Sequence, residues 1–171
     1  MSPTAGFVPR WAVASSFLLS LFGLGVSIYL SVTHFDKQLL LCSTTGTFNC
    51  SAVTTSPQSY FLGVPVAFLG LGNFVVMSAL TSPWAWRARS YWLHVTRFVL
   101  GIVAMAFVLW LIAAELLIIN HICEWCTSVH VATFALLIVL SRVCPAQLGW
   151  TRSHAEEASP LGLVETSPDT V

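Results

Sequence analysis

The sequence predicts an all-α integral membrane protein, built as a four-transmembrane-helix bundle with an extracytoplasmic cap loop. Three observations support this fold class. The 171 residues are 56% hydrophobic and 8% charged, with a mean hydropathy of +0.81, whereas an ordinary soluble domain is about 25% charged. Four apolar runs approach the length of about 20 residues that crosses a bilayer. The basic residues also fall almost entirely on one side of these runs, as the positive-inside rule requires.

The first two apolar runs occupy 11–32 and 62–80. The run at 11–32 is uncharged, and we interpret it as an uncleaved membrane helix. It is too long for the apolar part of a signal peptide, only Arg10 precedes it, and no A-x-A cleavage site follows. The run at 62–80 contains Pro65, which suits the first turn of a helix, and several glycines, which allow close helix contact in lipid. Both runs therefore predict spanning helices.

The third and fourth runs occupy 98–114 and 125–140. The third contains no charged residue and can be extended by its flanking residues. The fourth is short, and its start is more polar because it carries Thr127, Ser128 and His130. Both are near the length of a spanning helix, which completes a prediction of four crossings.

Four crossings place both chain termini on one side of the membrane. Only Lys37 among the basic residues lies on the opposite side, and the positive-inside rule makes the arginine-rich side cytoplasmic. We therefore expect a cytoplasmic N-terminus at 1–10, a membrane domain at 11–141 and a cytoplasmic tail at 142–171, which is rich in Ser, Thr, Glu and Pro and expected to be disordered. The loop at about 33–61 should face outward. The six basic residues on the cytoplasmic side are Arg10, Arg87, Arg89, Arg97, Arg142 and Arg152.

We expect the polar and aromatic residues in and near the runs to have structural roles. Asn73 is expected to hydrogen-bond to another helix. Glu115 is expected to reach the interface or to pair with Lys37, and Arg97 to snorkel to the cytoplasmic surface. An aromatic belt is expected at that surface, formed by Trp84, Trp86, Tyr91 and Trp92.

Four of the five cysteines fall on the predicted outer side, where thiols can form lasting disulfides. Cys42 and Cys50 lie in the long loop, and Cys123 and Cys126 form a C-x-x-C motif at the mouth of the fourth helix. Cys144, on the cytoplasmic side, is interpreted as a spare thiol. The positive end of a helix favours a thiolate, which is the species that attacks disulfides. The pattern predicts two redox-active cysteine pairs.

Two cysteine pairs at a membrane surface suit a relay to a lipid-soluble acceptor. Each dithiol carries two electrons, and a quinone accepts two. An acceptor that drives disulfide formation must lie above roughly −120 mV, which a quinone satisfies and a nicotinamide does not. His130 lies four residues after Cys126, on the same helix face, and we interpret it as a quinone ligand or proton donor. The seven basic and seven acidic residues cancel, which argues against nucleic-acid binding.

Two interpretations from other classes stay open at this point. The first is a noncatalytic membrane protein with two structural disulfides. The second is a metal-binding membrane protein, because thiolates and imidazoles are zinc ligands and four such side chains lie near one another in sequence: His121, Cys123, Cys126 and His130.

The residues around the cysteines resemble the vitamin K epoxide reductase family, bacterial type. The resemblance covers about 11–141 and rests on CSTTGTFNCSAVTTS at 42–56, FLGVPVAFLG at 61–70 and ICEWCTSVH at 122–130. It implies a four-helix bundle around a quinone site that the outer loop caps. It also implies a membrane enzyme that oxidises a separate thioredoxin-like (Dsb-type) partner and reduces a ubiquinone- or menaquinone-type acceptor.

The resemblance implies a role for each cysteine of the two pairs. Cys42 would take electrons from the partner, Cys50 would exchange with Cys123, and Cys126 would react with quinone. Ser56 matches the loop serine that helps to order the cap and Cys50. The quinone contacts expected from the resemblance and from the helix face are His130, Ser59, Tyr60 and Phe61.

Two positions depart from the animal members of the family. Ser59 stands where they carry a hydrogen-bonding asparagine, and His130 stands where they carry a tyrosine. These departures favour disulfide formation over reduction of vitamin K quinone or epoxide, which is the alternative within the enzyme class. The bacterial type implies the inner cell membrane, and a eukaryotic source would imply the endoplasmic reticulum. The chain ends at Val171 without a thioredoxin-like domain, so a separate partner is expected, and a monomer suffices for a four-helix bundle.

Overall fold

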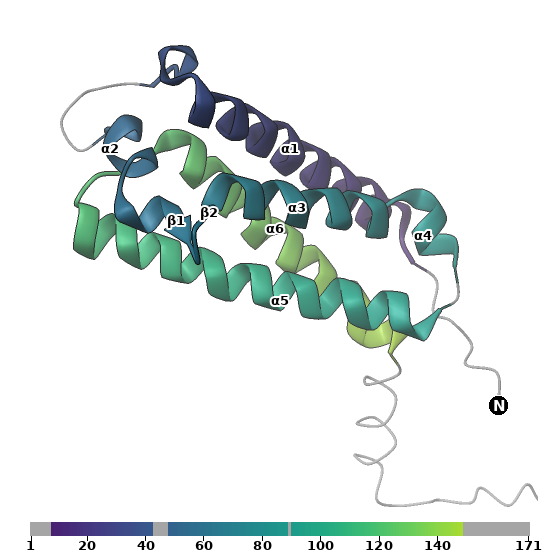
Figure 1. Ribbon diagram of the computed structural model, residues 1–171. Helices are drawn as coiled ribbons and strands as arrows, with labels where there is room; N and C mark the ends of the chain where they lie inside the picture. The colour runs from purple at the N-terminus through teal and green to yellow at the C-terminus, as the bar shows by residue number, and fades with distance from the viewer. Residues whose placement is uncertain (1–7, 43–47, 89, 149–171) are drawn as a thin grey trace, which may run out of the picture.

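The computed structural model describes residues 8–42, 48–88 and 90–148, and in these the chain is mostly helical. Four helices of this part lie side by side, namely α1 (Arg10–Phe35), α3 (Val66–Leu80), α5 (Tyr91–Ala113) and α6 (Glu124–Gln147) (Figure 1). They run in alternating directions, so that α1 begins and α6 ends at the same end of the bundle.

The short elements gather at the two ends of the bundle. One end, here called the cysteine end, carries the start of α6 and six elements: η1 (Lys37–Leu39), α2 (Cys50–Thr54), η2 (Pro57–Ser59), β1 (Tyr60–Phe61), β2 (Val64–Pro65) and η3 (Ala114–Ile119). The other end, here called the arginine end, carries α4 (Pro83–Arg87). The strands β1 and β2 pair antiparallel as a small hairpin.

Three described helical segments are long and apolar enough to cross a membrane, namely Arg10–Phe35, Tyr91–Ile119 and Glu124–Pro145. The α3 helix has 15 residues and rises about 22 Å, which is less than the roughly 30 Å of a bilayer core. The expected helix at 62–80 therefore starts too early. Leu62 and Gly63 have positive φ angles of 51° and 82° and form the hairpin turn, so the helix begins only at Val66.

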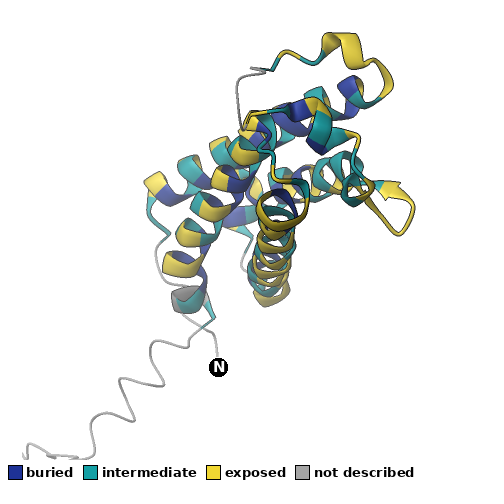
Figure 2. Cartoon of the chain, turned by 90° about the vertical axis from the view of Figure 1, so that its left-hand side faces the viewer, coloured by how far each residue is buried: buried dark blue, intermediate teal, exposed yellow. Residues whose placement is uncertain are grey.

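The outward faces of the bundle are apolar, as the bilayer requires. Figure 2 shows exposed residues on the outer surface of the helices and on the projecting hairpin, with buried residues turned inward. Leu62 at the hairpin turn is 90% exposed, and large apolar side chains such as Leu18, Val75 and Leu109 are exposed along the helices.

The α1 helix packs along both α3 and α6 through small side chains. Small residues let helix backbones approach closely in lipid. At Gly23 an added Cβ atom would collide with the ring of Phe74 on α3, whereas at Gly25 it would meet nothing within 4 Å. The buried small residues recur three or four positions apart on one face, and they are Ser16, Ser20, Gly23, Ser27 and Ser31.

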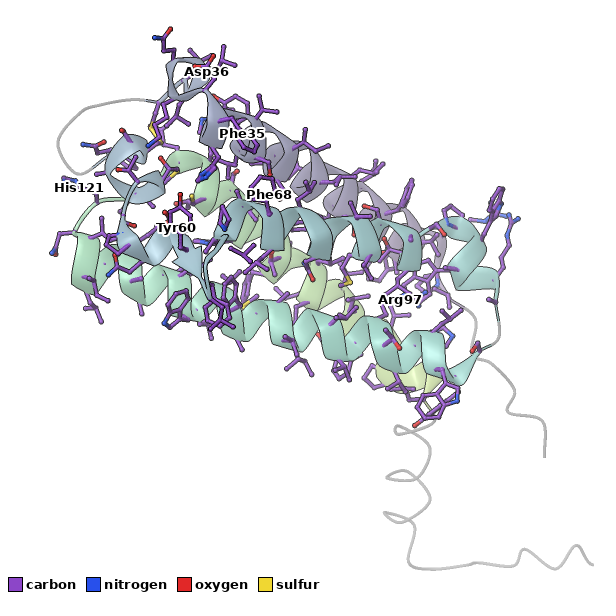
Figure 3. The ribbon with its side chains drawn as sticks, in the orientation of Figure 1. Phe35, Asp36, Tyr60, Phe68, Arg97 and His121 are labelled. Carbon is purple, nitrogen blue, oxygen red and sulfur yellow. A yellow bond between two sulfur atoms is a disulfide. The ribbon has the colours of Figure 1, made fainter. Side chains whose placement is uncertain are left out.

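Arg97 lies inside the bundle near the arginine end, so the expected snorkelling is wrong (Figure 3). Its side chain is fully buried, and its Nε and Nη2 atoms donate to the carbonyl of Leu80. Leu80 is the last residue of α3, and its carbonyl has no helical partner. The guanidinium also lies 3.7 Å from the ring centre of Trp86, a favourable cation–π contact. Trp86 is therefore a buried residue and not part of an exposed aromatic belt.

The α6 helix continues past the expected boundary at 141. It includes Pro145 and ends at Gln147, and Val143 and Cys144 are buried. The residues just after 141 therefore belong to the bundle and not to a disordered tail. The remainder of that predicted tail, 149–171, and residues 1–7 of the N-terminus lie outside the described residues.

Candidate redox site

The C-x-x-C motif starts α6 at the cysteine end. Cys123 is the N-cap residue, and its Sγ atom accepts a hydrogen bond from the backbone N–H of Cys126 at 3.4 Å. Both are free thiols. The hydrogen bond from the Cys126 thiol holds the pKa of Cys123 below its ordinary value, against the opposing effects of burial and of the charge on Glu115. The positive end of the helix thus acts on Cys123, the first cysteine of the motif.

The loop cysteines form a disulfide beside this motif. Cys42 and Cys50 are bonded, with their Cα atoms 6.0 Å apart. Cys50 opens α2, whose N-terminus is capped by Asn49 through a bond from Ala52 N to its Oδ1 atom at 3.0 Å. Cys50 is fully buried and packs in one cluster with Cys123. The two pairs expected from the sequence are therefore neighbours.

Backbone pairing brings these two distant segments together. The N–H of Asn49 donates to the carbonyl of Ile122 at 3.1 Å, and Phe48 forms a parallel bridge with Ile122. The residues that follow are Cys50 on one segment and Cys123 on the other. The bridge therefore fixes which cysteine of the loop faces the motif.

A second contact holds the chain just before Cys42, and we call it the Trp125 latch. The Nε1 atom of Trp125 donates to the carbonyl of Leu41 at 2.7 Å, and the N–H of Leu41 donates to the hydroxyl of Tyr29 at 2.8 Å. The rings of Tyr29 and Trp125 lie 4.7 Å apart. The latch ties the loop to α1 and to the first turn of α6.

A cavity of about 460 Å³ opens beside Cys126, between the cap and the helices α1, α3, α5 and α6. This volume is within the usual range for small-molecule sites. Its walls are mostly apolar, as expected for a lipid-soluble ligand. Cys126 lines the cavity and keeps part of its surface accessible, whereas Cys123 is fully buried behind it.

Three of the four expected quinone contacts line this cavity, namely Ser59, Phe61 and His130. Tyr60 does not. Its hydroxyl lies 3.3 Å from Nε2 of His34, and its ring joins the aromatic group that Figure 3 labels with Phe35 and Phe68. In the two-residue strand β1 successive side chains point to opposite faces, so Phe61 and Tyr60 cannot both face the cavity.

Ser56 joins α2 to the rest of the cap. Its hydroxyl donates to the carbonyl of Val53 in the last turn of α2 at 2.8 Å. Its own carbonyl accepts from the hydroxyl of Ser59 at 2.7 Å. Ser56 therefore connects the helix that begins at Cys50 with a residue of the cavity wall.

Sequence reasoning assigned structural roles to two residues that line the cavity. Glu115 is 6% exposed and lies in the cavity wall, which overturns the expected interfacial position and the pairing with the exposed Lys37. Asn73 on α3 also lines the cavity, and His34 on α1, which received no role, does so too. The spacing of Glu115 from the C-x-x-C motif gave no signal, because a wide helical turn and a loop separate them.

The metal interpretation has no geometric support. Among residues 8–42, 48–88 and 90–148, no group of three or more His, Cys, Asp or Glu side chains is arranged to hold a metal ion. His121, one of its supposed ligands, has a buried Nδ1 atom without a hydrogen-bond partner in the described part. Cys144, the fifth cysteine, is a buried free thiol in the last turns of α6, away from the two pairs.

Residues 15–141 match the family model described as the vitamin K epoxide reductase family. None of the curated proteins compared with the chain matches it.

Proposed function

Because the chain belongs to the vitamin K epoxide reductase family, we propose that it is a membrane thiol:quinone oxidoreductase that supports disulfide bond formation. It oxidises a separate, extracytoplasmic thioredoxin-like protein and passes the electrons through two cysteine pairs to a ubiquinone- or menaquinone-type acceptor. The proposal names a donor, an acceptor and a direction, all three of which an assay can test.

The observation that carries the proposal is that the two cysteine pairs pack against each other and that one of them borders an apolar cavity. The disulfide of Cys42 and Cys50 packs against Cys123. Cys123 contacts Cys126, which lines the cavity. Two unrelated structural disulfides would need neither the packing of Cys50 against Cys123 nor a cavity beside Cys126.

In the proposed relay, the partner thiolate attacks Cys42 and displaces Cys50 as a thiolate. The second thiol of the partner attacks the partner–Cys42 bond, so that the partner leaves as a disulfide and Cys42 is freed as a thiolate. Cys50 then attacks Cys123 in the oxidised C-x-x-C motif, which forms a Cys50–Cys123 disulfide and releases Cys126. Cys42 attacks Cys50 in that bond, which re-forms the Cys42–Cys50 disulfide and leaves both cysteines of the motif reduced. Two electrons move in each exchange. The described state, with the loop pair oxidised and the motif reduced, matches the stage just before the electrons leave the protein.

The cavity wall fits a quinone head group. A quinone bound there accepts two electrons and two protons. Phe61 supplies an aromatic face, and its ring packs at 5.4 Å and 5.8 Å from Phe107 and Trp110. Ser59 and His130 supply polar groups in an otherwise apolar wall, which would orient the ring carbonyls toward Cys126.

We further propose that α3 and the β1–β2 hairpin complete a fourth crossing, with the cysteine end extracytoplasmic and both termini cytoplasmic. Arg10, Arg87 and Arg142 support this orientation, because they lie on elements at the arginine end, and Lys37 lies at the other end. By the positive-inside rule the arginine end faces the cytoplasm. The proposed location is the inner membrane of a bacterium, with the protein as a monomer.

The test is quinone absorbance during turnover. Purified protein in detergent receives a reduced thioredoxin-like donor and a short-chain benzoquinone or naphthoquinone. We expect quinol formation that requires the donor and disappears in Cys126→Ala. The matched control is Cys144→Ala, which removes a buried thiol outside the relay and should keep activity.

Other acceptors separate the competing functions. Reduction of vitamin K epoxide at a rate above that of quinone would make the epoxide the main substrate. If the folded protein reduces neither type of quinone, both cysteine pairs are structural and the proposed relay is wrong.

A further inference from the structure

The carboxyl group of Glu115 is buried in the wall of the cavity. The side chain is 6% exposed, and no lysine or arginine from the described part of the chain lines the cavity. The titratable side chains that share this wall are His34 from α1 and Cys126 and His130 from α6. Burying an ionisable group without a counter-ion costs free energy, and inside a membrane such a group is by default a functional candidate.

The backbone around Glu115 is unusual in a way that turns the carboxyl inward. The α-helical part of α5 ends at Ala113, and the chain continues directly into the π-helical turn η3. Such wide turns are rare and occur often at functional sites. The three residues after Glu115 are exposed on the outer surface, and they are Leu116, Leu117 and Ile118. Glu115 alone among these four faces the interior.

The inward carboxyl reaches the redox motif. The backbone N–H of Cys123 interacts with it, and its charge acts on the sulfurs of both Cys123 and Cys126. The second of these sulfurs opens to the same cavity as the carboxyl. A proton can therefore pass between thiol, carboxylate and a ligand in the cavity without crossing apolar protein.

Oxidation of a dithiol by a quinone requires such a path, because two protons must leave the sulfurs and two must arrive on the quinone oxygens. On the basis of the proposed function, we propose that Glu115 accepts the proton of the Cys126 thiol and delivers it to a quinone oxygen. Glu115 is then a catalytic proton-transfer residue of this enzyme, a role that the motif alone does not indicate.

The S–H bonds of Cys123 and Cys126 break and one S–S bond forms between them, and the electron pair passes to the quinone. The Cys126 proton moves to Glu115 and from there to the nearer quinone oxygen. The Cys123 proton then follows the same route, through Glu115, to the other oxygen. Glu115 begins and ends the step as a carboxylate, and two O–H bonds have formed.

The first experiment uses no quinone. In a chain where Cys42, Cys50, Cys123 and Cys144 are serine, Cys126 is the only thiol, and its alkylation by iodoacetamide is followed against pH. A negative charge near a thiol disfavours the thiolate. We expect Glu115→Gln to shift the midpoint of alkylation to lower pH, and Asp36→Asn, which removes an exposed acid at the same end, to leave it unchanged.

The second experiment measures quinol formation with the four relay cysteines intact. We expect Glu115→Gln to lower the rate about a hundredfold, the low end of general acid–base effects, although its thiolate forms more readily. Donor-driven reduction of the loop disulfide should keep its rate. A merely structural role would not make the thiol more reactive and the enzyme slower at once.

The outcomes separate the two proposals. If the unmodified protein reduces no quinone, the proposed function fails whatever Glu115 does. If it does reduce quinone and Glu115→Gln retains both the rate within twofold and the alkylation midpoint, the role of Glu115 is wrong. Should the Gln variant not fold, Glu115→Asp keeps the acid but draws it back by one methylene, and a rate equal to that of the unmodified protein would likewise reject the role.

Discussion

Arg97 is a buried charged residue that connects neighbouring elements at one end of this bundle. Its guanidinium contacts two other elements, through the Leu80 carbonyl of α3 and the Trp86 ring of α4, and lies 3.1 Å from Nδ1 of His94 in its own helix. A helix of 15 residues leaves its last carbonyls within the protein rather than at a polar surface. Arginine suits this position because its planar fork donates several hydrogen bonds and stacks on an aromatic face.

Replacing Arg97 with methionine should therefore destabilise the bundle. We expect a loss of about 2 kcal/mol, typical of hydrogen bonds from a charged group, seen as a lower midpoint of thermal unfolding in detergent. Arg97→Lys should recover little of it, because an ammonium group lacks the fork and the flat stacking surface. A lysine variant as stable as the unmodified protein would show that the charge alone matters.

The reactivity of Cys123 should depend on the hydrogen-bonding capacity of residue 126. The Cys126 thiol lowers the pKa of Cys123, so the thiolate is present above that lowered pKa and is lost as pH falls through it. Removing the donor should raise the pKa and move alkylation to higher pH. With the other three cysteines replaced by serine, Cys126→Ala should alkylate at higher pH than Cys126→Ser, which keeps a hydroxyl donor. Equal midpoints would mean that the helix end alone sets the reactivity.

The Trp125 latch should control how fast the loop pair passes electrons on. Trp125→Phe keeps a ring against Tyr29 but removes the bond to the Leu41 carbonyl. One hydrogen bond contributes about 1 kcal/mol, so we expect quinol formation from a thiol donor to slow about fivefold. The matched control is Trp92→Phe, which alters an exposed tryptophan outside the cap.

At the residue scale, side chains that act through local sequence were predictable, and those that act through distant contacts were not. Spacing singled out the four cysteines that lie together at the cysteine end, and the position of His130 one turn after Cys126 indicated that both would lie on one side of the helix, where both line the cavity. Glu115 was misplaced because its partner N–H lies across the turn between two helices. Arg97 was misplaced because nothing near it in sequence shows the unpaired carbonyl of Leu80.

At the scale of single elements, the small-residue face of α1 sets how closely the helices approach. Gly23 has no room for a side chain because the Phe74 ring occupies that space, whereas Gly25 is open. Gly23→Val should therefore lower the yield of folded protein and its unfolding temperature. Gly25→Val, a substitution of the same chemistry two positions away, should leave both nearly unchanged. Equal losses in the two variants would point to helix propensity and not to packing.

The lengths of the apolar runs predicted that the four main helices exist, but local backbone geometry determines where each helix begins and ends. The positive φ of Leu62 is rare for a leucine, so no local pattern announced the hairpin that delays α3. Pro145 indicated an end for α6, but the helix includes it and continues to Gln147. The π-helical turn after α5 left no mark on the hydropathy profile, because Leu116, Leu117 and Ile118 are as apolar as any helix surface in lipid.

At the scale of the whole molecule, the proposed orientation can be tested by labelling. In a chain without native cysteines, Gln38→Cys lies at the cysteine end and Trp84→Cys at the arginine end, and both positions are exposed. A membrane-impermeant maleimide added to right-side-out vesicles should label position 38 and not position 84 until detergent opens the membrane. The reverse pattern would invert the orientation and place the relay in the cytoplasm.

The pairing of the loop with the start of α6 also has a consequence for biosynthesis. Leu41 and its partner Trp125 are 84 residues apart in the chain, and the partner of Asn49 is Ile122. Residues 41–50 therefore leave the ribosome long before the segment that aligns them has been made. A nascent chain of this length already contains Cys42 and Cys50, but Cys123 and Cys126, with which they would exchange in the proposed relay, have not yet been synthesised. In the proposed relay, electrons can therefore pass from the loop pair to the C-x-x-C motif only after the last helix has been made.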